Sequence, residues 1–120
     1  MIDEVEQLIA ELIRQQWIRV CFGPKTQPSA IAAIRRHQCW ADVVVLRGHD
    51  QAAAYRAVLG PGDDPLIAEY VLWHYIGTAE AVLRAALGLS WDVPLEAGYP
   101  IPEQCRIPEA QRRPITIRLG

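Results

Sequence analysis

Two adjacent residues, His49 and Asp50, have the side chains that acid–base catalysis uses most often. An imidazole titrates near neutral pH, and a carboxylate can orient the ring as a general base. The pair follows an apolar segment and comes directly after Gly48. Glycine, histidine and aspartate are equally typical of a turn at such a position. His49 and Asp50 are therefore catalytic candidates whose residue types a turn explains equally well.

A third catalytic candidate, His74, lies inside an aromatic segment at residues 70–76. In an extended chain His74 shares a face with Leu72 and Ile76, whereas Glu69 falls on the opposite face. The alternative interpretation is a histidine of the core or of an interface. The three histidines, at positions 37, 49 and 74, lack the spacing of a metal site, so we expect no bound metal.

The cysteines and the short motifs give less support for chemistry. The three cysteines, at positions 21, 39 and 105, are an odd number without a C-x-x-C pair, which argues against a disulfide framework and a zinc site. Cys39 lies near His37, but the sequence shows no oxyanion site for a nucleophilic thiolate. No phosphate-binding loop, dinucleotide fingerprint, hydrolase elbow or metalloprotease motif occurs. We therefore expect no cofactor.

The positive charge of the chain is almost entirely arginine, with Lys25 as the only lysine and a net charge of −2. A mildly acidic domain gains little from attraction to phosphates, so nucleic-acid binding is not expected. A smaller patch for an anion would form if two of the expected strands pair. Its members would be Arg35, Arg36, Arg47 and Arg56.

Large aromatic side chains offer a second kind of site, a surface that binds another protein. The chain has four tryptophans and four tyrosines but one phenylalanine, so most of its aromatic side chains carry a polar tip. Such side chains are enriched at interfaces. The binding candidates are Trp17, Trp73, Tyr75, Trp91 and Tyr99.

The elements that must position these residues follow from apolar periodicity. A period of 3.6 residues predicts a helix, alternation predicts a half-buried strand, and a short fully apolar run predicts a central strand. Residues 51–59 fit two structures, because their alanines favour a helix while the preceding short turn favours a hairpin. We favour the strand. The predicted order is a helix at 2–16, a strand at 17–22, a helix at 27–37, strands at 41–47, 51–59 and 70–76, and a helix at 78–87.

The last quarter of the chain differs in composition from the rest. Repeated prolines between residues 91 and 113 exclude a long helix or a central strand and predict an extended arm. Residues 115–119 predict a short terminal strand at a sheet edge. We therefore expect one α+β domain, with a core at residues 1–91 and a Pro-rich arm at residues 92–120. Its mostly antiparallel sheet of three to five strands would carry helices on one face, in the order α-β-α-β-β-β-α.

The arm and the aromatic residues suggest a function without catalysis. Apolar side chains of the arm gain from burial on the parent domain, on a second subunit or on another protein. We expect a small soluble, cytoplasmic accessory or protein-binding domain of the immunity, chaperone or subunit-stabilising type, acting through its sheet face and arm. It would form a homodimer or join a complex, without contacting a membrane. The alternative is a small enzyme or ligand-binding domain whose apolar pocket uses His49 or His74 as acid or base.

Overall fold

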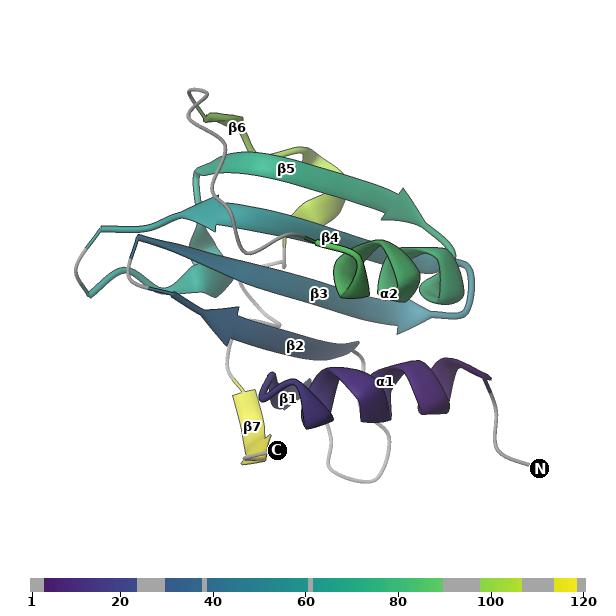
Figure 1. Ribbon diagram of the computed structural model, residues 1–120. Coiled ribbons are helices and arrows are strands. Elements are labelled where there is room, and N and C mark those ends of the chain that lie inside the picture. Colours follow the sequence, from purple (N-terminus) through teal and green to yellow (C-terminus); the bar gives the residue numbers. More distant parts are fainter. Residues whose placement is uncertain are drawn as a thin grey trace.

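The computed structural model describes residues 4–23, 30–37, 39–60, 62–89, 98–106 and 114–118, which form one antiparallel sheet and two helices (Figure 1). Helices α1 (Glu4–Arg14) and α2 (Ala79–Leu87) lie on the same face of the sheet. Two short 3-10 helices, η1 (Pro65–Ile67) and η2 (Glu103–Cys105), complete the helical part. The strands are β1 (Ile18–Phe22), β2 (Ala30–Arg36), β3 (Trp40–Gly48), β4 (Gln51–Val58), β5 (Tyr70–Gly77), β6 (Tyr99–Pro100) and β7 (Pro114–Arg118).

The strands lie side by side in the order β6-β5-β4-β3-β2-β1-β7, and each neighbouring pair is antiparallel. Strands β1 to β5 form a simple meander, since each pairs with the next along the chain. The expected α+β class with an antiparallel sheet and helices on one face is confirmed. The expected three to five strands are too few.

The helix predicted at residues 27–37 is wrong, because β2 occupies residues 30–36 and residues 24–29 lie outside the described part. The alanines, with Ile31 and Ile34, fit a helical stripe in isolation. In the fold this segment lies between β1 and β3, with Ile34 opposite Ile18 on one side and Val43 on the other. Pairing on both sides satisfies the whole backbone and overrides the local helix propensity.

The ambiguous segment after the His49–Asp50 turn is a strand, as predicted. In β4 the residues Ala53, Tyr55 and Ala57 face one side of the sheet, and Ala52 and Ala54 face the helices. The small alanine side chains let α2 pack closely on this strand. The strand predicted at 70–76 and the helix predicted at 78–87 also form, and Thr78 caps α2 by accepting a hydrogen bond from the Ala81 N–H at 3.2 Å.

The sheet has an apolar core on each face. On the helix side, Leu12 and Leu83 cover Val44 and Ala54. On the far side, Tyr55 and Val71 form a core that Leu66, Ile101 and Cys105 close. The Tyr55 hydroxyl donates a hydrogen bond to the Pro65 carbonyl at 2.8 Å, which fixes η1 on this face.

The described part of the C-terminal arm packs on its own domain. The Ile101 N–H donates to the Glu69 carbonyl at 2.9 Å, and the side chains of Ile101 and Cys105 are buried. The Arg47 guanidinium holds the following turn by donating to the Arg106 carbonyl at 2.6 Å. Strand β7 pairs with β1 at the other edge of the sheet. Among the described residues, no helix is long and apolar enough to cross a membrane.

Candidate functional site

Strand β5 is the most exposed aromatic element of the fold. Strand β6 pairs with it only at Tyr70 and Val71. Within the described part of the chain, no strand pairs with residues 72–77 on their outer side. Near this free edge the side chains of Tyr75 and Ile76 are 41% and 44% exposed. Strand β5 therefore presents both unpaired backbone and apolar side chains to solvent.

Two of the predicted binding residues, Trp73 and Tyr75, lie together on the helix side of β5. They stand opposite Arg56 and Ala54 of β4, and their rings stack with centroids 6.5 Å apart. Trp73 is half-buried against the core under the helices, so it supports the more exposed ring of Tyr75. The stack is a rigid aromatic surface that costs little side-chain entropy on binding.

The opposite side of β5 joins His74 to Tyr99, a catalytic candidate and a binding candidate from distant parts of the sequence. The His74 Nδ1 lies 2.7 Å from the Tyr99 hydroxyl, and the rings meet edge to face. Burial, with a smaller contribution from Cys105, raises the pKa of Tyr99, so the phenol keeps its proton at neutral pH. The contact fastens the arm to β5.

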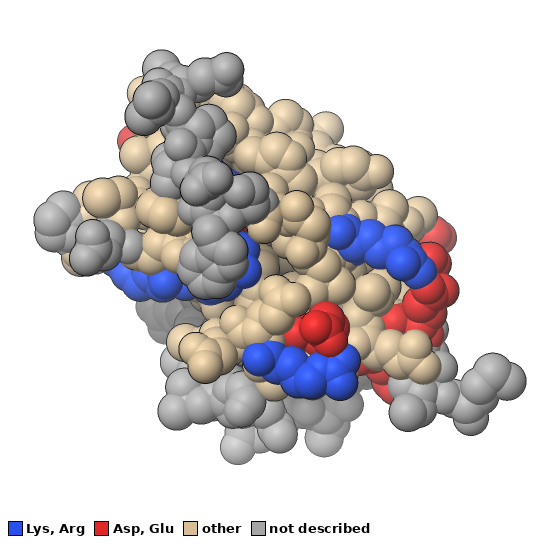
Figure 2. All heavy atoms as spheres, in the orientation of Figure 1, with Lys and Arg blue, Asp and Glu red and all other residues tan. Residues whose placement is uncertain are grey.

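Strand β5 contains no aspartate, glutamate, lysine or arginine. On the face shown in Figure 2, the part of the surface over β5 that grey atoms leave visible is mostly tan, the colour of residues that are neither acidic nor basic. Monomeric proteins commonly protect an exposed strand edge with lysine, proline or a bulge. Here the protection is a pairing irregularity next to Leu72, where Arg56 pairs with Trp73 but Ala57 pairs with Val71. Residues 73–77 continue the ladder beyond this irregularity.

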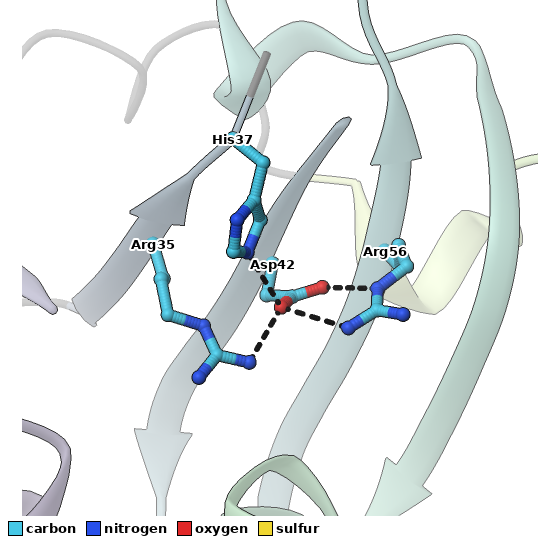
Figure 3. Close-up of polar contacts among 4 residues, drawn as sticks. All are labelled: Arg35, His37, Asp42 and Arg56. Carbon is cyan, nitrogen blue, oxygen red and sulfur yellow. Dashed lines mark hydrogen bonds and ion pairs between the residues drawn. The ribbon is translucent and has the colours of Figure 1, made fainter. Parts of the chain in front are cut away.

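A second group of polar residues lies buried on the helix side of the sheet, centred on Asp42 (Figure 3). The Arg56 Nε donates to one Asp42 carboxylate oxygen at 2.7 Å, and its Nη2 donates to the other at 3.1 Å. The Arg35 Nη2 donates to that second oxygen at 2.8 Å. Each residue is a direct cross-strand neighbour of the next, because Arg35 pairs with Asp42 and Asp42 pairs with Arg56.

Aromatic rings enclose this Arg35–Asp42–Arg56 cluster. The Arg35 guanidinium lies 4.9 Å from the centre of the Trp17 ring, and that of Arg56 lies 5.6 Å from Trp40. His37 stacks on Trp40 with its Nε2 at 3.6 Å from Asp42. Burial lowers the pKa of His37 and outweighs the opposing effect of Asp42. The cluster is a closed polar network, and its enclosed charges are shielded from water.

Two of the candidate groups do not have the arrangement that their suggested roles need. Trp17 is one of the binding candidates, but only 1% of it is exposed, so it offers no contact surface in this structure. The four arginines do not form one anion-binding patch, since Arg36 donates to the Asp63 carbonyl and Arg47 to the Arg106 carbonyl, away from Arg35 and Arg56. The basic residues on the face shown in Figure 2 are likewise split into separate groups. Distant backbone carbonyls, which sequence patterns do not reveal, hold these two arginines.

The other catalytic candidates are not brought together. His49 and Asp50 are exposed in the β3–β4 turn, and no hydrogen bond or ion pair joins their side chains within the described residues. His49 lines a crevice of about 200 Å³ between α1 and the sheet, while Asp50 lines a separate pocket of about 240 Å³ with Ile76. Burial raises the pKa of the Cys105 thiol to about 11, so this cysteine is not a nucleophile at neutral pH.

Trp91 lies outside the described residues. No group of metal-ligating side chains occurs in the described part of the chain. Comparison of the sequence with protein-family models and with curated proteins, and of the structure with solved structures, finds no match. The function must therefore be argued from the geometry alone.

Proposed function

We propose that this protein is a small non-catalytic accessory domain that binds an extended segment of another protein along the free edge of β5. The observation that carries the proposal is an uncharged edge strand whose outer backbone is unpaired at residues 72–77 in the described structure. An added strand would satisfy these backbone groups by continuing the antiparallel ladder.

The side chains near this edge supply apolar contact area on both faces of the sheet. Tyr75 projects on the helix side over the support of Trp73, and Ile76 projects on the far side. In strand addition, the backbone provides affinity and alternate side chains provide specificity. A partner segment with apolar residues at alternate positions would match both exposed side chains.

The strand is held in place before any partner arrives. One side is paired with β4 along most of its length, and the His74–Tyr99 contact ties its far face to the arm. A preformed strand loses little conformational entropy on binding, which favours affinity. The described arm thus stabilises the binding strand, and is not itself the segment offered to the partner.

A charge placed at the free edge tests this proposal. Tagged wild-type chain, Ile76→Lys and Ile18→Lys would be purified gently from the native host, followed by light scattering and mass spectrometry. Ile18 is a matched control, because it is 37% exposed against 44% for Ile76 and lies on β1, far across the sheet. We expect a stoichiometric partner with the wild type and the control, and none with Ile76→Lys. Equal recovery by all three chains would contradict the proposal.

A second copy of the chain is the other occupant that the edge could accept. An isologous β5–β5 contact would bring no carboxylates, lysines or arginines of the two strands together, because β5 contains none. The same purification separates the cases, since a homodimer gives twice the chain mass with no second protein. Loss of that dimer in Ile76→Lys would identify the homodimer as the bound state.

The crevice beside His49 favours one alternative, a small enzyme or ligand-binding domain. It lies between the sheet and α1, and Val5, Ile9 and Leu46 give it an apolar lining. A ligand with an apolar body and a polar group near His49 would suit this shape. A thermal-shift screen of small molecules against wild type, His49→Ala and His74→Ala tests it. Stabilisation that persists in both variants would exclude these histidines as ligand-binding groups.

A further inference from the structure

A groove lies at the other end of β5, where the chain turns from β4 through η1. Its volume is about 470 Å³. Three of its lining side chains, Val58, Ile67 and Tyr70, are apolar or aromatic and between 43% and 52% exposed. Exposed apolar side chains that converge on a concave surface are typical of a contact site for another protein.

Acidic side chains line the same groove. Asp63, Asp64 and Glu69 contribute three carboxylates, and none of the described lining residues is a lysine or an arginine. A described cation, Arg36, also lies beside this loop, where its guanidinium donates a hydrogen bond to the Asp63 carbonyl at 2.9 Å. The groove therefore combines exposed apolar side chains with charged lining residues that are all acidic.

Two of these carboxylates accept hydrogen bonds from backbone N–H groups, and the third does not. Asp63 accepts a hydrogen bond from the Gly60 N–H at 2.7 Å, and Asp64 accepts one from the Leu66 N–H at 2.9 Å. These bonds fix the loop and hold both carboxylates in place. The exposed Glu69 side chain makes no hydrogen bond or ion pair within the described residues, so no described side chain occupies its carboxylate.

We infer that this groove binds a cationic apolar segment of a partner protein, with an apolar side chain between Val58, Ile67 and Tyr70 and a neighbouring arginine or lysine beside Glu69. Charge complementarity selects this partner, because an acidic segment would face three carboxylates at short range. The inference adds a contact of defined chemistry to the proposed protein-binding function and rests on that function. It does not depend on strand addition at residues 72–77.

The contact has a distinct energetic signature. Charged groups at the rim of an interface mainly change association rate and salt dependence, whereas a buried aromatic anchor contributes more to affinity. We therefore expect Glu69→Gln to weaken binding roughly two- to five-fold at low salt. Tyr70→Ser should weaken binding roughly ten-fold or more, with little change in the salt dependence.

The test uses three short synthetic peptides in place of the partner. One has a central leucine flanked by arginines, the second has glutamates in place of the arginines, and the third has serines. Binding would be followed by backbone amide NMR shifts of the full chain at several salt concentrations. The peptides would be titrated against wild type, Glu69→Lys and the matched control Glu6→Lys, whose site lies on the exposed side of α1.

We expect the basic peptide alone to shift the amides of Val58, Ile67 and Tyr70, with affinity that falls as salt rises. Glu69→Lys should lose this binding and Glu6→Lys should keep it. Equal binding of all three peptides, binding of the basic peptide elsewhere, or absence of binding would overturn the inference. The Ile76→Lys purification would still report on strand addition, so the two proposals can fail separately.

Discussion

Replacement of Asp42 by asparagine should be the most damaging conservative change in the fold. The carboxylate is fully buried and compensates Arg35 and Arg56, whose side chains are only 6% and 3% exposed. Asparagine keeps the shape but removes the charge, which leaves two buried guanidinium groups without their shared anion. Removal of one partner from a buried ion pair typically costs about 3–5 kcal/mol. Since small domains have a total stability of about 5–15 kcal/mol, the loss would be a large fraction.

Urea unfolding followed by circular dichroism measures this loss as a change in the free energy of unfolding. Asp50→Asn is a matched control, because Asp50 is exposed in the β3–β4 turn and its replacement should stay within roughly 0.5 kcal/mol. We expect a lower urea midpoint with an unchanged slope for Asp42→Asn. A loss below about 1 kcal/mol would refute the view that Asp42 neutralises the two arginines.

A triple variant tests whether the fold needs the charges of the cluster, or whether apolar side chains of similar length can replace them. Arg35→Met, Asp42→Leu and Arg56→Met together replace the ions by apolar side chains of similar length. Such replacements are often neutral or stabilising, because they remove the desolvation cost of all three groups. We therefore expect the triple variant to be more stable than Asp42→Asn. A triple variant as unstable as Asp42→Asn would show that packing on Trp17 and Trp40, and not charge, dominates.

Three further predictions concern pH, a buried hydroxyl and the cysteines. Burial lowers the pKa of His37 in the folded state. The stability that neutral His37 contributes is therefore present above the unfolded pKa near 6.5, and it is lost as the pH falls toward the lower folded pKa. Urea midpoints measured between pH 7.5 and pH 5 should fall for the wild type, and they should fall less for His37→Gln. Tyr55→Phe should lower the free energy of unfolding by about 1 kcal/mol, because the Pro65 carbonyl loses its hydrogen bond, and a change within the error of chemical denaturation would contradict this role. Burial raises the pKa of Cys105 to about 11, so Cys105 should resist iodoacetamide in the folded chain while the exposed Cys39 reacts. Peptide mass spectrometry measures the labelling of each cysteine. Faster labelling of Cys105 than of Cys39 would be inconsistent with the burial of Cys105.

Most strands of this fold can be predicted from the sequence, but which of their residues are buried cannot. Alternation over residues 17–22 places Trp17 on the side opposite Val20 and Phe22. In the structure Trp17 belongs to the core under the helices, and Val20 and Phe22 belong to the core on the far face of the sheet. Alternation does not say which element covers each face, so it does not distinguish a buried Trp17 from a binding residue at the surface. Burial depends on a packing partner from elsewhere in the chain, which local periodicity does not encode.

The error at residues 27–37 has a related cause. Ile31 and Ile34 are three residues apart, which matches a helical stripe, yet in β2 they point to opposite faces. Strand β2 is stabilised by its neighbours β1 and β3 on either side. An alanine-rich strand in the middle of a sheet therefore resembles a helix when its sequence is considered alone.

The candidate sites show the same limit. Aspartate within the apolar run at residues 41–47 was a signal for a buried ion pair, because a central strand rarely carries an uncompensated charge. Its partners, Arg35 and Arg56, belong to the neighbouring strands and become identifiable only with the hairpin register. The aromatic character of β5 was visible in the sequence. Its free edge could not be predicted, because it depends on β6, a two-residue strand of the arm that pairs only with Tyr70 and Val71.

Amide hydrogen exchange of β5 in the free chain and in the complex purified from the host tests strand addition most directly. The account predicts fast exchange at the outward-facing amides of residues 72–77 in the free chain and marked protection in the complex, because an added strand would hydrogen-bond them. The amides of β1, which pair with β2 and β7 already, should not change. Protection confined to β1 or to the helices, with β5 unchanged, would contradict the account.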